Sequence, residues 1–166
     1  MQEITREALV AKASELFEKG VVDRMLGWKK GEFSYDVTPG VFTSMDEVNK
    51  DFIWDDFCGA NFSKYLLKET AKTEKKVLVF LKPCDTYSFN QLLTEHRFDR
   101  EKVYAVGVGC NGMLDVAKLR SSAEGILRVN TEDPDKVAVE TLYDGTVTLD
   151  RAELLPDRCF CGFCAL

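Results

Sequence analysis

The hydrophobic and polar positions along the chain divide it into alternating strands and helices. The clearest signals are two continuous apolar runs of strand length, 77–81 and 103–108, with a helical pattern over 86–95 between them. Continuous apolar runs are typical of parallel strands that are covered on both faces. This order predicts a β-α-β unit with a right-handed crossover.

The N-terminal third of the chain predicts a helix and then a strand. Apolar residues at helical spacing indicate an amphipathic helix over 4–19, which Gly20 would end in the left-handed conformation. A strand over 21–28 follows. Beyond it, Pro39-Gly40 is expected to form a turn, and Ser44 could cap a short helical turn.

The C-terminal part predicts a β-hairpin made of strands 137–143 and 146–149. Asp144-Gly145 between them suits a two-residue type I′ turn. The remaining helical segments are expected over 60–72, 113–122 and 151–155. Together these elements predict the α/β class: an open, largely parallel sheet with flanking helices and a C-terminal hairpin that leads to a cysteine-rich terminus.

Length indicates the number of domains, and charge indicates which partners to expect. The 166 residues contain no repeat and no linker, so we expect a single domain over 1–166 that includes a candidate ligand segment at about 157–166. Lys and Arg are scattered and the net charge is −6, which argues against a nucleic-acid partner. The charged N-terminus does not resemble a signal peptide, and no apolar run suggests a membrane span. We therefore expect a cytoplasmic protein.

The six cysteines are the main candidates for chemistry. Three of them stand in the last eight residues, where Cys161 and Cys164 form a Cys-x-x-Cys pair that can bring two thiolates to one metal centre. Cys159 adds an overlapping Cys-x-Cys pattern. Disulfides are not expected in a reducing compartment. Any single isolated cysteine is more simply read as a small buried hydrophobe.

Topology predicts that two distant cysteines meet. Cys84 and Cys110 each follow one of the two buried strands. The loops that leave the carboxyl ends of parallel strands gather on one edge of the sheet. The two thiols should therefore lie on the same edge, and close together if the strands are neighbours.

Four thiolates, from Cys84, Cys110, Cys161 and Cys164, would suit either zinc or a 4Fe-4S cluster. Structural zinc sites usually use two close pairs, whereas here only one close pair accompanies two single cysteines on separate loops. This asymmetry favours a cluster and an electron-transfer function. A zinc-stabilised protein-interaction module without redox activity is the alternative. A dithiol redox protein is disfavoured, because redox Cys-x-x-Cys motifs normally open a helix after a strand.

The residues also resemble a known family. The run 82–85 (Lys-Pro-Cys-Asp) and the later run 109–112 (Gly-Cys-Asn-Gly) are similar to motifs of the beta subunits of deazaflavin-dependent hydrogenases and dehydrogenases, including formate-dehydrogenase-like members. That family carries Pro-Cys after one strand, Cys-x-Gly after the next and a later Cys-x-x-Cys. The segments 54–66 and 97–104 resemble bacterial members, and the resemblance extends from Leu16 onward.

The resemblance implies an iron-sulfur flavoprotein subunit of a hydrogenase-like or formate-dehydrogenase-like oxidoreductase. It implies a 4Fe-4S cluster on four cysteines, with FAD as a second cofactor and with other hydrogenase, dehydrogenase or heterodisulfide-reductase-like subunits as partners. The implied ligands are Cys84, Cys110, Cys161 and Cys164. Cys159 could replace one of the last two. Family members continue well past the Cys-x-x-Cys, so we expect a fragment, a split-gene subunit or a minimal form.

Other residues have weaker claims to a role. Cys58 could be a fifth thiol near the cluster or a buried structural cysteine. Lys82 could place positive charge beside the cluster or a flavin phosphate, or could be a solvated lysine. Asp85 is expected to cap the helix that follows Cys84. No acid-base catalyst is expected.

Three further residues complete the set of candidates. Asn111 and Gly112 are weak candidates for cofactor binding and are better explained as shaping their loop. His96, the chain's single histidine, lies in a polar segment and is expected to be exposed.

Overall fold

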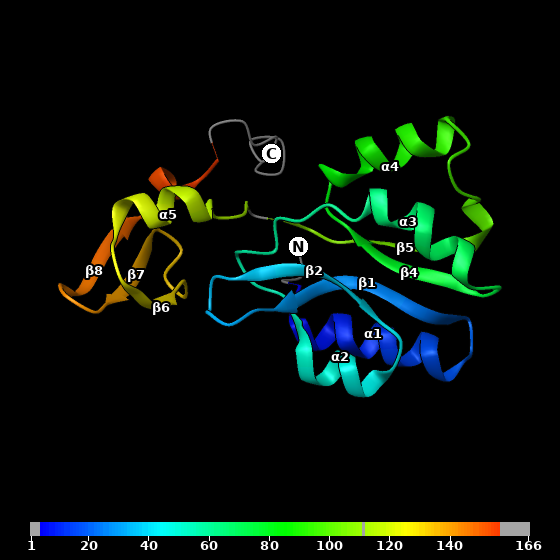
Figure 1. Cartoon of the computed structure of the whole chain (residues 1–166), viewed down its shortest axis with the longest axis horizontal. Helices are drawn as coiled ribbons and strands as arrows, with labels where there is room; N and C mark the ends of the chain where they lie inside the picture. The colour runs from blue at the N-terminus through cyan, green and yellow to red at the C-terminus, as the bar shows by residue number, and fades with distance from the viewer. Residues whose placement is uncertain (1–3, 111, 157–166) are drawn as a thin grey trace.

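Two β-sheets lying side by side form the framework of the protein (Figure 1). The computed structural model describes residues 4–110 and 112–156. The larger sheet has the order β2-β1-β4-β5, and a short β3 also pairs with β1. Its strands are β1 Val22–Lys30, β2 Val37–Phe42, β3 Phe52–Ile53, β4 Lys76–Leu81 and β5 Val103–Gly107.

The core of the larger sheet is parallel, as predicted. Strand β4 pairs in parallel with both β1 and β5, whereas β2 and β3 pair with β1 in antiparallel fashion. Residues 77–80 of β4 are fully buried, because helices cover both faces of the sheet. Figure 1 shows α1 (Arg6–Glu18) and α2 (Met45–Asp51) on one face, and α3 (Ser63–Glu69) and α4 (Asp85–Thr94) on the other.

Local sequence signals set the ends of the first two helices. Thr5 Oγ1 accepts a hydrogen bond from the Ala8 N–H and caps α1, and Ser44 Oγ caps α2 in the same way. Gly20 follows α1 with a φ of 64°, and its N–H donates to the Phe17 carbonyl. This is the left-handed conformation that the sequence predicted for Gly20.

We expect Gly20→Ala to lower the free energy of unfolding by about 1 kcal/mol, because a Cβ disfavours left-handed backbone. The added Cβ would lie 3.6 Å from Lys75 Nζ, an ordinary contact, so the backbone and not a clash causes the loss. Urea denaturation measures the change. Gly59→Ala is the matched control, since its Cβ would meet open space without left-handed backbone. Equal stability of the two variants would contradict the prediction.

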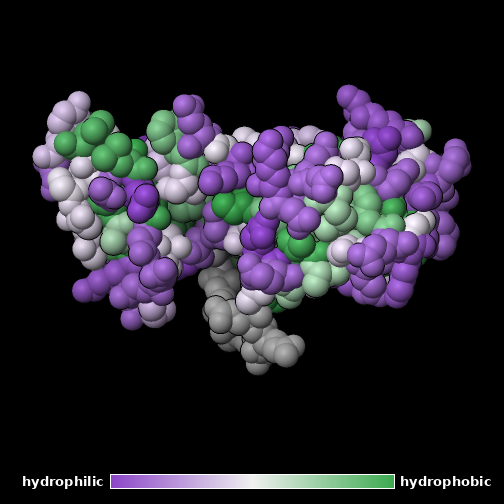
Figure 2. Space-filling model, turned by 90° about the horizontal axis from the view of Figure 1, so that it is seen from below, coloured by the Kyte–Doolittle hydropathy of each residue, from purple (hydrophilic) through white to green (hydrophobic). Residues whose placement is uncertain are grey.

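The smaller sheet contains the predicted hairpin. It has the order β6-β7-β8 and is antiparallel, with β6 Ile126–Asn130, β7 Lys136–Thr141 and β8 Gly145–Asp150. The helix α5 (Val116–Ser122) and the 3-10 helix η3 (Arg151–Leu154) pack against it around a separate hydrophobic cluster. Strand β6 was not predicted from the sequence. Figure 2 shows apolar surface at this end of the molecule, where Leu127, Leu142 and Tyr143 are exposed.

The hairpin turn differs from the predicted type I′ turn. Thr141 pairs with Gly145, so three residues form the loop, and only Gly145 has a positive φ, of 69°. A three-residue loop of this kind ends in a glycine in the left-handed conformation. The Thr141 hydroxyl stabilises it by donating to the Gly145 carbonyl and by accepting the Asp144 N–H.

A second correction concerns Pro39-Gly40, which lies inside β2 and not in a turn. Pro39 stands opposite Trp28, and Gly40 stands opposite Gly27. Strand β2 is at the end of the sheet order, where a proline without an N–H is tolerated.

The helical boundaries also shift by a few residues. The predicted helix over 60–72 begins at Ser63 and continues after Glu69 as the 3-10 helix η1 (Thr70–Lys72). A further 3-10 helix, η2 (Arg100–Lys102), precedes β5. The helix predicted over 113–122 begins only at Val116, because Asp115 caps it. Among the residues that the structure describes, no helix is both long and apolar enough to cross a membrane.

Contacts through the segment before α3 join the two sheets. The Arg151 guanidinium pairs with the Asp56 carboxylate, and the Leu114 N–H donates to the Asp56 carbonyl at 2.8 Å. Each sheet nevertheless has its own cluster of buried side chains. That the whole chain forms one domain stays a prediction.

Candidate functional site

The carboxyl edge of the larger sheet brings two predicted ligand loops together. Strands β4 and β5 are parallel neighbours, and their last paired residues are Leu81 and Gly107. The Val108 N–H then donates to the Leu81 carbonyl at 2.9 Å, which ties the two strand ends together. Cys84 and Cys110 each follow three residues later, so both lie at the same edge, as the topology predicted.

The described thiols fit half of a four-thiolate centre. Cys84 is half-buried and Cys110 is buried, and thiolates are the donors that zinc and iron-sulfur clusters use. The other candidates, Cys159, Cys161 and Cys164, lie outside the described residues. Within 4–110 and 112–156, no three His, Cys, Asp or Glu side chains gather closely enough to hold a metal ion. The full ligand set stays a prediction.

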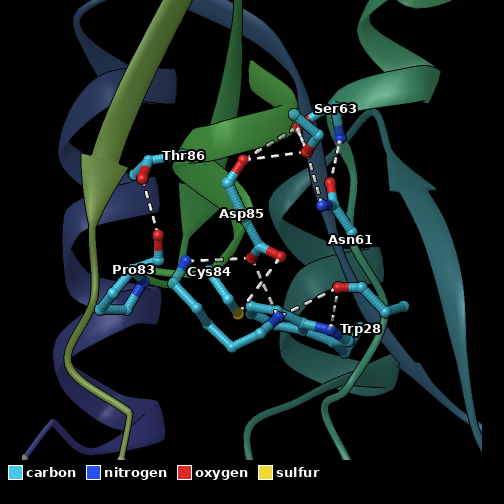
Figure 3. A network of polar contacts seen from close by, with 10 residues as sticks. Trp28, Asn61, Ser63, Pro83, Cys84, Asp85 and Thr86 are labelled. Atoms are coloured by element: carbon cyan, nitrogen blue, oxygen red, sulfur yellow. Dashed lines mark hydrogen bonds and ion pairs between the residues drawn. The ribbon is translucent and has the colours of Figure 1, made fainter. Parts of the chain in front are cut away.

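Lys82 is a buried cation and not the solvated lysine that one interpretation of the sequence offered. Lys82 directly follows β4, and its side chain is 2% exposed. The Nζ atom donates to the Ala60 carbonyl at 3.1 Å, pairs with Asp85 Oδ2 at 3.0 Å and lies 4.6 Å from the centre of the Trp28 ring (Figure 3). A fixed positive charge therefore stands two residues from Cys84.

Asp85 holds the loop of Cys84, which corrects its predicted role as a helix cap. It is the first residue of α4, and its carboxylate turns back to accept the Lys82 N–H at 3.0 Å. Cys84 occupies the capping position without a side-chain cap bond, and its thiol donates to Asp85 Oδ1 at 3.9 Å. The buried cation draws the carboxylate inward, because a buried charge needs a partner.

The ring of Trp28, in β1, packs against the Lys82 ammonium. Its Nε1–H donates at 3.2 Å to the Ala60 carbonyl, the same atom that Lys82 contacts. The rings of Trp54 and Phe62 pack against it, with centroids at 4.9 and 4.7 Å. Trp28 was not among the predicted site residues, because its role depends on pairing between β1 and β4 and no local motif marks it.

A groove of about 490 Å³ lies between α3, α4 and β2, and Ala60 forms part of its lining. One wall is polar: the Asn61 amide donates to Ser88 Oγ at 2.7 Å, and Ser88 Oγ donates to Ser63 Oγ at 3.0 Å (Figure 3). The other walls include apolar surface from Pro39, Tyr65 and Leu92. None of these residues was a candidate from the sequence.

Cys58 has the environment of a structural cysteine. It is fully buried, and its sulfur accepts the Asp55 N–H at 3.3 Å and lies 3.4 Å from Asp55 Oδ1. Burial, followed by the nearby Asp55 charge, raises the pKa of the Cys58 thiol well above its usual range. Burial also raises the pKa of Asp55. These contacts support the interpretation of Cys58 as a buried, protonated thiol.

We expect Cys58 to resist alkylation by iodoacetamide in the native protein and to react fully in denaturant. The thiolate is the reactive form, and each unit of raised pKa lowers its population about tenfold. Mass spectrometry of the Cys58 peptide before and after denaturation measures the difference. Equal modification under both conditions would contradict the assignment.

The remaining candidates occupy loops. His96 is exposed, as predicted, and follows α4 with a φ of 52°. Gly112 has a φ of 104°, a conformation that favours glycine, which supports its predicted role in shaping the loop. Asn111 lies outside the described residues.

Comparison with known sequences finds relatives among formate dehydrogenase beta subunits. No family model matches the chain. It is 29% identical over 133 residues to the F420-dependent formate dehydrogenase subunit beta of Methanocaldococcus jannaschii, covering 80% of this chain and 35% of that one. It is 28% identical over 138 residues to the F420-dependent formate dehydrogenase 1 subunit beta of Methanococcus maripaludis, covering 83% and 34%. The chain thus spans about a third of the length of these curated relatives.

Comparison with solved structures finds a chain with a similar fold. A chain of the xenon-derivatised F420-reducing [NiFe] hydrogenase complex from Methanosarcina barkeri superimposes with a TM-score of 0.61 at 16% identity, covering 90% of this chain and 56% of that chain. At this identity the match shows a shared fold. The resemblance that the motifs around Cys84 and Cys110 predicted is therefore confirmed: over most of its length the chain is similar in sequence to beta subunits of F420-dependent formate dehydrogenases.

Proposed function

We propose that this chain is an electron-transfer subunit of an oxidoreductase complex, in which one 4Fe-4S cluster relays electrons between a flavin or deazaflavin site and a partner subunit. The carrying observation is that Cys84 and Cys110 follow neighbouring parallel strands and share one sheet edge. The homology to formate dehydrogenase beta subunits supports the oxidoreductase class. The partners proposed are other hydrogenase, dehydrogenase or heterodisulfide-reductase-like subunits.

The residues proposed to hold the cluster are Cys84, Cys110, Cys161 and Cys164, with Cys159 as a possible replacement for one of the last two. Such a cluster, when bound, takes up and releases one electron at a potential that the surrounding protein sets. The chain's contribution is to hold two thiols on adjacent strand ends. The contact between Asp85 and the Lys82 N–H fixes one of these loops.

FAD is the second proposed cofactor, and the groove between α3 and α4 is its proposed site. Apolar walls with a few ordered polar groups suit a planar ring, and Asn61 and Ser88 provide those groups. The Lys82 ammonium is buried against Ala60, Asp85 and the Trp28 ring. Lys82 would therefore act on a cofactor through its charge and not by direct contact with a phosphate.

Anaerobic purification of the full chain, with iron, sulfide, zinc and flavin quantified together, tests the proposal. We expect a brown protein with about four irons and four sulfides per chain, as a 4Fe-4S cluster requires. A colourless protein with one zinc and no iron would overturn it and support the zinc-stabilised interaction module. Flavin content tests the FAD proposal separately.

A further inference from the structure

We propose that the buried charges of Lys82 and Asp85 each shift the reduction potential of the cluster at Cys84, in opposite directions, so that the two effects largely cancel in the wild-type chain. This inference rests on the proposed function. Lys82 and Asp85 are positioning residues here, because they act through the Cys84 ligand and do not take part in electron transfer themselves.

The Lys82 charge is fixed in place. Its Nζ contacts the Ala60 carbonyl, the Asp85 carboxylate and the face of the Trp28 ring, and its side chain is 2% exposed (Figure 3). A lysine held on three sides within a hydrophobic core cannot swing into water. Its charge is therefore poorly screened and acts over a longer distance than a surface charge.

The Asp85 charge lies beside the ligand sulfur. Asp85 Oδ2 binds both nitrogen atoms of Lys82, and Oδ1 lies 3.9 Å from Cys84 Sγ. When Cys84 is a thiolate, that carboxylate places a second negative charge next to it. Lys82 offsets this charge, so the pair leaves the loop close to neutral.

Stability alone does not explain such a pair. A buried ion pair often stabilises a fold no better than hydrophobic residues of similar size, because desolvation offsets the attraction. Here the pair lies in the loop that carries a predicted ligand, between the end of β4 and the start of α4. That location gives both charges a direct effect on the electron affinity of a bound cluster.

The two charges have opposite expected effects. Uptake of an electron adds negative charge to a cluster, so a nearby cation favours the reduced form and a nearby anion opposes it. Lys82→Met should therefore lower the midpoint potential, and Asp85→Asn should raise it. The double variant should return close to the wild-type value, because both charges are gone.

The experiment is an anaerobic redox titration of the full chain with its cluster, with iron content measured for each variant. We expect each single variant to change the reduction equilibrium about tenfold, or about 59 mV for one electron, in opposite directions. Lys68→Met is the control: Lys68 is exposed on α3, and its removal should leave the potential unchanged.

Shifts of both single variants in the same direction, or no shift with full iron content, would overturn the proposal. If Lys82→Met fails to fold, Asp85→Asn decides the matter, because asparagine keeps an oxygen that can accept the Lys82 N–H; an unchanged potential then overturns the proposal. Absence of iron from the wild-type chain would overturn the proposed function and this inference together. Normal iron with unchanged potentials would overturn this inference alone.

Discussion

Cys84→Ser and Cys110→Ser are each expected to reduce the iron content of the anaerobically purified chain to less than about a tenth of the wild-type value, because a serine hydroxyl is a poor substitute for a soft thiolate ligand. The two residues follow adjacent parallel strands. Among the described residues, neither loop has a second thiol that could replace the lost ligand. Iron and sulfide determination per chain measures the effect.

Cys58→Ser is the matched control for these variants. Its sulfur is fully buried against Asp55, and its replacement should largely spare the iron content. Circular dichroism and thermal unfolding of all three variants separate loss of a ligand from loss of the fold. Full iron occupancy in both Cys84→Ser and Cys110→Ser would contradict the ligand assignment.

The parallel edge of the sheet was predictable, because burial on both faces leaves a plain signal in the sequence. Residues 77–80 of β4 are apolar throughout and are fully buried in the structure. The second apolar run, β5, was also expected to be buried, but it ends the sheet order and only Val103 in it is buried. Two apolar strands with a helix between them still allow few arrangements. The shared edge of Cys84 and Cys110 followed from that topology without any knowledge of side-chain packing.

The smaller sheet was less predictable, because its strands are partly exposed. In β6, most residues between Ile126 and Asn130 are exposed or half-exposed, so no clear alternation of hydrophobic and polar positions marks the strand. Pro39-Gly40 was expected to form a turn but lies in β2. A proline-glycine pair usually marks a turn, but at the edge of a sheet the missing N–H has no cost.

The charged centre of the site could not be predicted from local patterns. A lysine before a proline, just after a strand, has the sequence appearance of a solvated residue. Lys82 becomes buried only because β1 places Trp28 beside β4 and because the segment before α3 presents the Ala60 carbonyl. Asp85 then pairs with the cation and not with the helix terminus, which explains why its predicted capping role was wrong.

Trp28→Ala is expected to lower the free energy of unfolding by about 3–5 kcal/mol, because it removes a large, fully buried side chain from the core. The loss includes ring contacts with Trp54 and Phe62 and exposes the Lys82 ammonium to a cavity. Urea denaturation measures the change. Trp28→Phe keeps an aromatic ring but loses the bond to the Ala60 carbonyl, so a smaller loss of about 1–2 kcal/mol is expected.

The control for this series is Tyr143→Ala, since Tyr143 is 80% exposed at the hairpin tip. Its replacement should change the free energy of unfolding by less than about 0.5 kcal/mol, as is usual for surface substitutions. If Trp28→Ala costs no more than Tyr143→Ala, the ring does not hold the core together beneath Lys82. Losses that decrease in the order Trp28→Ala, Trp28→Phe, Tyr143→Ala would confirm that the buried ring of Trp28 stabilises the core next to Lys82.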